Sequence, residues 1–154
     1  MNTRRFVSSV ALAAAGLLLS AAAPSAESRV PAISIVVYKD PNCGCCKNWV
    51  EHLRKHGFAV TVHDTSDVSG AKETGRVPEQ LRTCHTAFVN GYVVEGHVPA
   101  EDIQRMLDQK PKIAGIGVAG MPAGSPGMEV GSRHDAFDVV AFNRDGSTRV
   151  FSHH

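Results

Sequence analysis

Four cysteines are the residues of this sequence best suited to carry chemistry, and three of them are crowded together. Cys43, Cys45 and Cys46 form the motif Cys-Gly-Cys-Cys, and Cys84 follows much later in the chain. Thiolates are both nucleophiles and soft metal ligands, so the cluster indicates either a site for Cu(I) or Zn(II) or a redox site. Such crowding is expected to disfavour disulfides, which need particular Cα separations and dihedral angles.

The elements around this motif place it at the start of a helix. A short β-branched run predicts a buried strand over 33–38, and the spacing of apolar residues predicts a helix over 45–56. The free N–H groups and the dipole at a helix start stabilise anions, so thiols there are expected to have lowered pKa values. Two interpretations stay open: a C-x-x-C pair of an oxidoreductase, Cys43 with Cys46, or a polythiolate metal site. Cys45 favours the metal site, because a third thiol offers a competing disulfide partner.

The remaining pattern predicts one α/β domain. After the first helix we expect a strand, two short helices, a hairpin and a third helix, over 58–63, 64–76, 78–82, 86–89 with 92–95, and 99–107. Asn-Gly between the two hairpin strands is a strong turn signal. The resulting order β-α-β-α-β-β-α, with a parallel first pair of strands, is that of a thioredoxin-like core.

A long segment rich in Gly and Pro follows the third helix. The stretch 113–131 is predicted to be a loop, and 137–142 with 148–151 to be an extra C-terminal β-hairpin. Met121 and Met128 lie in this loop, and thioether sulfur suits Cu(I), so both are candidate additional ligands. The alternative is that they are flexible apolar fillers of the core.

Cys84 occupies the place where thioredoxin-like proteins usually carry a cis-proline, beside the start of the first helix. We therefore expect Cys84 to lie close to the Cys-Gly-Cys-Cys motif and to complete a four-thiolate metal site. The alternatives are a small buried core residue or a plain disulfide. His85 is a candidate ligand or proton carrier, although alternation along a strand would turn it away from Cys84. His97 precedes the helix that starts at Pro99 and is a weaker candidate, because bridging a turn would also explain it.

The N-terminus has the layout of a secretory signal peptide, predicted over 1–26. Arg4 and Arg5 precede a short apolar run over 10–19, and small residues follow. This run is too short to span a bilayer, so no membrane span is expected after cleavage. The mature chain, 27–154, is then a single exported domain, placed in the periplasm. Its charge is near neutral, which gives no electrostatic case for nucleic acid.

Three segments together carry a resemblance to a known family: CGCCKNWVEHL over 43–53, CHTAFVNGYVVEGHVPAEDI over 84–103 and GMPAGSPGMEVG over 120–131. The chain resembles the CopG-type periplasmic copper-resistance family, formerly a domain of unknown function. The resemblance implies a thioredoxin-like protein that binds copper through its cysteines, with a multinuclear thiolate-bridged cluster as one form of the site. Carried over, this role falls on Cys43, Cys45, Cys46 and Cys84.

The expected function is Cu(I) binding in copper resistance or homeostasis, with copper ions and other periplasmic copper-handling proteins as partners. One alternative is a thioredoxin-like oxidoreductase acting on thiols or on copper. A second alternative is a structural module stabilised by zinc, since four thiolates can close a tetrahedral Zn(II) site. Adjacent cysteines fit such a closed site poorly and fit a bridged cluster better, so copper binding is favoured and no catalytic residue is assigned.

Overall fold

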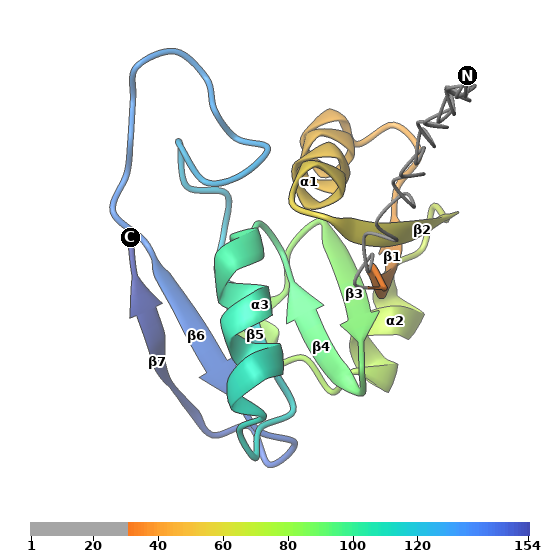
Figure 1. Cartoon of the computed structure of the whole chain (residues 1–154), viewed down its shortest axis with the longest axis vertical. Coiled ribbons are helices and arrows are strands. Elements are labelled where there is room, and N and C mark those ends of the chain that lie inside the picture. Colours follow the sequence, from red (N-terminus) through yellow and green to blue (C-terminus); the bar gives the residue numbers. More distant parts are fainter. Residues whose placement is uncertain (1–30) are drawn as a thin grey trace, which may run out of the picture. The chain divides into compact units, whose positions relative to one another are not determined.

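A mixed sheet of seven strands organises residues 31–154, which the computed structural model describes (Figure 1). The predicted signal peptide lies outside these residues. The strands are β1 (Ile33–Lys39), β2 (Phe58–Asp64), β3 (His85–Val89), β4 (Tyr92–Glu95), β5 (Gly115–Val118), β6 (Asp138–Phe142) and β7 (Thr148–His153). The α-helices are α1 (Gly44–Lys55), α2 (Ser69–Thr74) and α3 (Ala100–Gln109). In this part of the chain no helix is long and apolar enough to cross a membrane.

The strand order in the sheet is β2-β1-β3-β4-β5-β6-β7. β1 and β2 run parallel, as predicted, and β3 pairs antiparallel with both β1 and β4. The predicted order β-α-β-α-β-β-α is found from β1 through α3, and the C-terminal hairpin is β6 with β7. The short helix expected over 78–82 is a single 3-10 turn, Glu79–Leu81.

The prediction of a loop over all of 113–131 is wrong at its beginning, where β5 pairs with β4 and β6. Two glycines lower the strand propensity of this segment, which hid it from sequence reasoning. The packing explains one of them: a Cβ at Gly115 would overlap the carbonyl oxygen of Val93 and lie 2.8 Å from the ring of Phe142. Neighbouring strands therefore define β5, because its own side chains carry little strand signal.

The two faces of the sheet bury different elements. Helices α1 and α3 cover one face, with a core that includes Trp49, Leu53, Ile103 and Met106. The other face carries α2 and a smaller apolar cluster of Val77, Leu81, Val93 and Phe142. Side chains alternate along β3, so one set reaches the α1 side and the other set reaches the α2 side.

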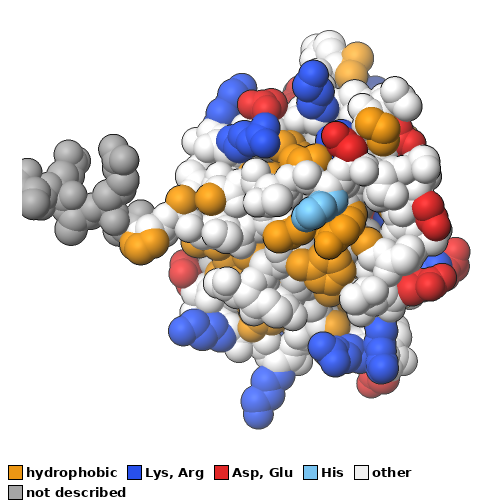
Figure 2. Space-filling view, turned by 90° about the vertical axis from the view of Figure 1, so that its right-hand side faces the viewer, with side chains coloured by type: hydrophobic (Ala, Val, Ile, Leu, Met, Phe, Trp, Pro, Cys, Tyr) orange, Lys and Arg blue, Asp and Glu red, His pale blue; other side chains and the backbone are white. Residues whose placement is uncertain are grey.

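One face of the described residues carries both signs of charge. Figure 2 shows basic and acidic side chains interspersed around a small apolar area on one face. Exposed pairs such as Arg54 with Glu51, 2.7 Å apart, belong to this mixed surface and contribute little to stability.

Candidate metal centre

The Cys-Gly-Cys-Cys motif opens α1, as predicted. Cys43 is the N-cap residue, with extended backbone angles, and its Sγ accepts a hydrogen bond of 3.3 Å from the N–H of Cys46. The Cys43 N–H donates to the carbonyl oxygen of Asp40 at 3.1 Å, which fixes the turn between β1 and the helix. One of the free N–H groups in the first turn of α1, that of Cys46, therefore faces a sulfur atom.

Cys43 and Cys46 form a disulfide, whereas Cys45 and Cys84 are free. The expectation that crowding disfavours disulfides is therefore wrong for this pair. The cap and the third helical residue have Cα atoms 5.4 Å apart, within the range of about 4.4–6.8 Å that a disulfide requires. The C-x-x-C spacing at a helix start thus permits both interpretations, a redox pair and, after reduction, two more metal ligands.

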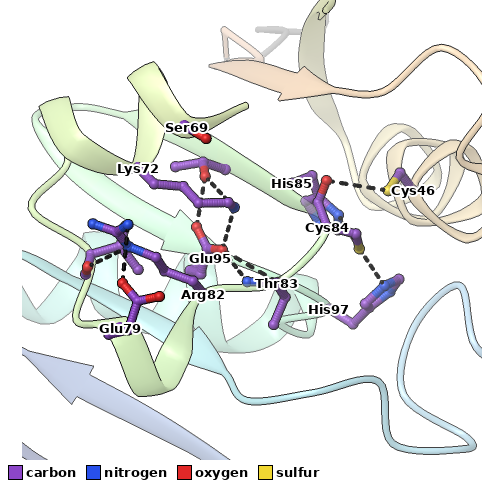
Figure 3. Close-up of polar contacts among 12 residues, drawn as sticks. Cys46, Ser69, Lys72, Glu79, Arg82, Thr83, Cys84, His85, Glu95 and His97 are labelled. Carbon is purple, nitrogen blue, oxygen red and sulfur yellow. Dashed lines mark hydrogen bonds and ion pairs between the residues drawn. The ribbon is translucent and has the colours of Figure 1, made fainter. Parts of the chain in front are cut away.

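Cys84 lies beside the motif, although 38 residues separate it from Cys46. The Sγ atoms of all four cysteines lie within 4.8 Å of one another. Those of Cys43 and Cys45 are 3.4 Å apart, and the Cys46 Sγ faces the carbonyl oxygen of Cys84 at 3.9 Å (Figure 3). The topology brings them together because β3 runs next to β1, so the chain entering β3 passes the start of α1.

Burial raises the pKa of the Cys84 thiol to about 12, and the neighbouring Cys45 thiol adds to this rise. The lowered pKa expected for thiols at the helix start does not extend to Cys84, which belongs to the chain entering β3. The free thiol is therefore protonated at neutral pH, and a bound metal ion would have to displace its proton.

Two buried histidines flank the Cys84 sulfur (Figure 3). The His85 Nδ1 lies 3.3 Å and the His97 Nε2 lies 3.4 Å from the Cys84 Sγ. These three residues offer donor atoms within 4.8 Å of one another. Burial lowers the pKa of both imidazoles, well below 6.5 for His85, so both rings are neutral at neutral pH. The alternation argument fails for His85 because Cys84 precedes β3 and does not share its regular geometry.

The position of His97 differs from that of a simple turn residue. Gly96 follows β4 with a φ of +71°, a conformation that suits glycine, and it redirects the chain so that His97 lies over Cys84. A Cβ at Gly96 would also lie 2.6 Å from the Thr83 hydroxyl. Glycine is thus required here on both counts.

A signal for His97 is present in the sequence, in the hairpin register. The two-residue Asn-Gly turn pairs Thr86 with Glu95 across β3 and β4. Continuing this antiparallel register by two positions places Cys84 opposite His97. Counting outward from the turn would therefore have identified His97 as a neighbour of the fourth cysteine.

The Gly- and Pro-rich loop closes over the site. The His97 Nδ1 lies 2.8 Å from the carbonyl oxygen of Pro126. Gly127 has a φ of +85°, and a Cβ there would lie 2.7 Å from the carbonyl oxygen of Cys45. The loop backbone is thus packed directly against the first turn of α1 and holds one of the two histidines.

The two candidate methionines lie in different surroundings. Met121 is 54% exposed and lines a surface hollow with Phe137 and Val140. Met128 is half-buried and directly follows Gly127, the residue packed on the start of α1. Met128 therefore lies in the part of the loop that contacts the motif, and Met121 lies on the surface.

A buried ion pair supports Cys84 from the α2 side of the sheet (Figure 3). The Lys72 ammonium donates to the Glu95 carboxylate at 2.6 Å and to the Thr86 hydroxyl at 3.1 Å. The same carboxylate accepts bonds of 2.7 Å from the Thr86 hydroxyl and from the Thr83 N–H. This network fixes the chain on both sides of Cys84. Sequence reasoning missed it because 64–76 reads only as a polar segment with a short helix.

The chain is similar to one described family and to two solved structures. The family described as "Protein of unknown function, DUF411" matches residues 81–128, which include Cys84, His85 and His97. Two solved structures, "Copper resistance protein copG- Form 2" and "Form 1", are 44% and 45% identical to the chain, each with a TM-score of 0.76. The matches cover 80% of this chain and 99% and 98% of those chains. No curated protein is significantly similar. At this identity and coverage, the chain belongs to the CopG copper-resistance protein family.

Proposed function

We propose that this protein binds Cu(I) and serves copper resistance or homeostasis. The observation that carries the proposal is the convergence of four cysteine sulfurs within 4.8 Å, from two distant parts of the chain. Thiolates are soft ligands that suit Cu(I), as they also suit Zn(II). The structural relatives named copper resistance proteins support copper as the metal. The proposed ligands are Cys43, Cys45, Cys46 and Cys84.

Full occupancy requires the reduced protein. Two electrons and two protons open the Cys43–Cys46 disulfide and give two thiols, which join the two that are already free. The consecutive residues Cys45 and Cys46 favour sulfurs that bridge several ions over one closed mononuclear site. We therefore include a multinuclear cluster in the proposal, with the thioether of Met128, and that of Met121 after loop movement, as additional donors.

The proposed cellular setting is the periplasm. Removal of the signal peptide over 1–26 would leave 27–154 as one thioredoxin-like domain that exchanges copper with other copper-handling proteins. The mass of the protein recovered from a periplasmic extract tests export. Recovery of the full-length chain from the cytosol alone would contradict it.

Anaerobic titration of the reduced protein with Cu(I), with metal quantification after desalting, tests the copper site. We expect at least one tightly bound Cu(I) per chain, and more than one if sulfurs bridge. Replacing all four cysteines by Ser should abolish binding, whereas His63→Gln, an exposed change on β2, should leave it unchanged. Equal copper binding by the four-serine variant would contradict the proposal.

A thiol or copper oxidoreductase is the second candidate, favoured by the Cys43–Cys46 disulfide at the start of α1. This geometry matches what thiol–disulfide exchange needs, a sulfur near free helical N–H groups. Equilibration in glutathione buffers tests it with Cys45→Ser/Cys84→Ser. If this variant still cycles its disulfide and reduces a test substrate, the enzyme interpretation gains; if both activities require bound copper, simple disulfide exchange is excluded.

A zinc-stabilised module is the third candidate, because four thiolates also satisfy Zn(II). Competition of the two metals for the reduced protein separates these interpretations. We expect Cu(I) to displace Zn(II) and to exceed one ion per chain. Retention of a single Zn(II) in the presence of excess Cu(I) would favour the structural module.

A further inference from the structure

We propose that Cys84, His85 and His97 form a second metal position, which takes a divalent ion such as Cu(II) or Zn(II) while Cys43 and Cys46 remain disulfide-bonded. This inference deepens the proposed copper binding by adding nitrogen donors. It does not depend on ligation by all four cysteines, because it concerns the oxidised protein.

The disulfide divides the site into two sets of donors. Its two sulfurs are bonded to each other and cannot act as thiolate ligands, so the four-cysteine set is lost in this state. The thiol of Cys84 remains free, and the two histidines keep their contacts to it. The oxidised protein therefore still presents one sulfur and two imidazole nitrogens around a common point.

The separations of these donor atoms suit one small ion. In a tetrahedral site, bond lengths of about 2.3 Å to sulfur and about 2.05 Å to nitrogen put the two donors about 3.6 Å apart. The Cys84 Sγ lies 3.3 Å from the His85 Nδ1 and 3.4 Å from the His97 Nε2. Both sulfur–nitrogen separations are therefore within a few tenths of an ångström of those in such a site, and the donor atoms of all three residues lie within 4.8 Å of one another.

A residue that is not one of the three proposed ligands fixes the orientation of the His97 ring. Its Nδ1 lies 2.8 Å from the Pro126 carbonyl oxygen, which can only accept a hydrogen bond, so Nδ1 carries the proton. The lone pair of a neutral ring then lies on Nε2, which faces the Cys84 sulfur. A backbone carbonyl that fixes the tautomer in this way is the usual partner of a metal-ligating histidine.

Packing alone does not explain why residue 85 is a histidine. It is fully buried against the Trp49 ring, with ring centroids 4.3 Å apart. Its Nε2 is the buried side-chain nitrogen or oxygen atom that has no hydrogen-bond partner among the described residues. Burying such an atom costs about 1–3 kcal/mol, which an apolar residue would avoid. The same ring presents Nδ1 to Cys84, so a role as ligand accounts for a histidine here.

One sulfur and two nitrogens define the class of ion. Imidazole suits Cu(II), Zn(II) and Co(II), and a single thiolate is compatible with each of them. On binding, the Cys84 thiol loses its proton to solvent as the sulfur–metal bond forms, so each ion bound releases one proton. A fourth coordination position is left for water or for the nearby Cys45 thiol.

Co(II) is the probe, because it fills zinc-type sites, reports sulfur ligation by absorption and does not oxidise thiols as Cu(II) can. Untagged protein is titrated anaerobically with CoCl₂ and without reductant, after a thiol assay confirms two free cysteines per chain. We expect one Co(II) per chain, a near-ultraviolet sulfur-to-cobalt charge-transfer band, and release of one proton.

The variants identify the ligands. Cys84→Ser should remove the charge-transfer band, and Cys45→Ser should retain it. His97→Gln and His85→Gln should each weaken Co(II) binding by more than about 100-fold, since loss of a merely orienting partner costs roughly 10–100-fold. His63→Gln, an exposed histidine on β2, is the matched control and should bind as the parent protein does. Circular dichroism of each metal-free variant checks that it is folded.

Three outcomes would overturn the proposal: unchanged Co(II) affinity in folded His97→Gln, a charge-transfer band that follows Cys45, or Co(II) binding only after the disulfide is reduced. Cu(I) titration of the reduced protein, run in parallel, separates this inference from the proposed function. Cu(I) binding without Co(II) binding removes the second position alone. Co(II) binding without Cu(I) binding removes the four-cysteine site alone.

Discussion

Two groups of buried polar side chains lie on opposite sides of the same strand, and they differ in how well their hydrogen bonds are satisfied. On the α2 side, Lys72 and Glu95 form an ion pair. The Thr86 hydroxyl accepts a hydrogen bond from the Lys72 ammonium and donates one to the Glu95 carboxylate. On the α1 side, His85 and His97 surround the Cys84 sulfur, and the His85 Nε2 has no partner among the described residues.

The difference separates a structural role from a ligand role. Buried polar groups are nearly always hydrogen-bonded, and a fully connected network rigidifies the fold. Lys72 and Glu95 meet this rule and hold the chain around Cys84. His85 is an exception to this rule, because its buried Nε2 has no hydrogen-bond partner among the described residues. Such an exception in a native fold calls for an explanation, and a ligand role supplies one. Four predictions test this division, in order of decreasing effect on stability.

The largest effect should come from breaking the satisfied pair. Lys72→Met leaves the Glu95 carboxylate buried without a countercharge, which should lower the free energy of unfolding by about 3–5 kcal/mol. Urea unfolding of the metal-free protein measures this. Arg54→Met, which removes the exposed pair with Glu51, is the control and should cost less than about 1 kcal/mol. Similar losses in both variants would contradict a structural role for the buried pair.

A second prediction concerns the loop that closes the histidine side. Gly127→Ala should lower the free energy of unfolding by about 1–3 kcal/mol, because the new Cβ meets the Cys45 oxygen at 2.7 Å and the Trp49 nitrogen at 2.8 Å. Gly131→Ala is the control: its φ of +65° is also strained, but nothing lies within 4 Å. Equal costs in the two variants would show that the loop does not pack on α1 as described.

The third prediction uses pH. Burial lowers the pKa of His85 well below 6.5, so well above pH 6.5 the ring is neutral in both the folded and the unfolded state. As the pH falls below 6.5 the unfolded state takes up a proton that the folded state refuses, and stability falls by up to about 1.4 kcal/mol per pH unit. Urea unfolding of metal-free protein between pH 7.5 and 5 should show a shallower loss in His85→Gln. Parallel curves for parent and variant would rule out this contribution.

The smallest effect is expected for His97→Gln without metal. The variant loses a ring nitrogen whose hydrogen bond to the Pro126 oxygen contributes about 1 kcal/mol, and the amide can replace part of it. Thermal unfolding in the presence of a chelator should therefore change little, although metal affinity falls strongly. A large loss of stability without metal would place His97 with the structural group instead.

Local sequence chemistry predicted most of the elements that build the site. The Asn-Gly turn set the β3–β4 hairpin, and the C-x-x-C spacing identified the start of α1. The nearness of Cys84 followed from topology, because a strand that enters beside β1 must pass that helix start. The hairpin and the helix start depend on short patterns of neighbouring residues, whereas the nearness of Cys84 depends on the order of the strands in the sheet.

The features that were missed depend on contacts between distant segments. Strand β5 is defined by its neighbours, and its Gly115 is required by packing on Val93. Lys72 reads as a surface residue until α2 places it over Glu95. His97 could have been found by extending the hairpin register, whereas its bond to Pro126 could not, because it depends on how the loop folds back over α1.

The intrinsic fluorescence of Trp49 should report directly on the site. It is the single tryptophan of the chain, it is fully buried, and its Nε1–H donates to the Val98 oxygen at 2.8 Å. Its ring contacts His85, so its emission arises next to the proposed second metal position. An open-shell ion bound there should quench this fluorescence and Zn(II) should not, which allows occupancy to be followed in the unmodified protein without an added dye.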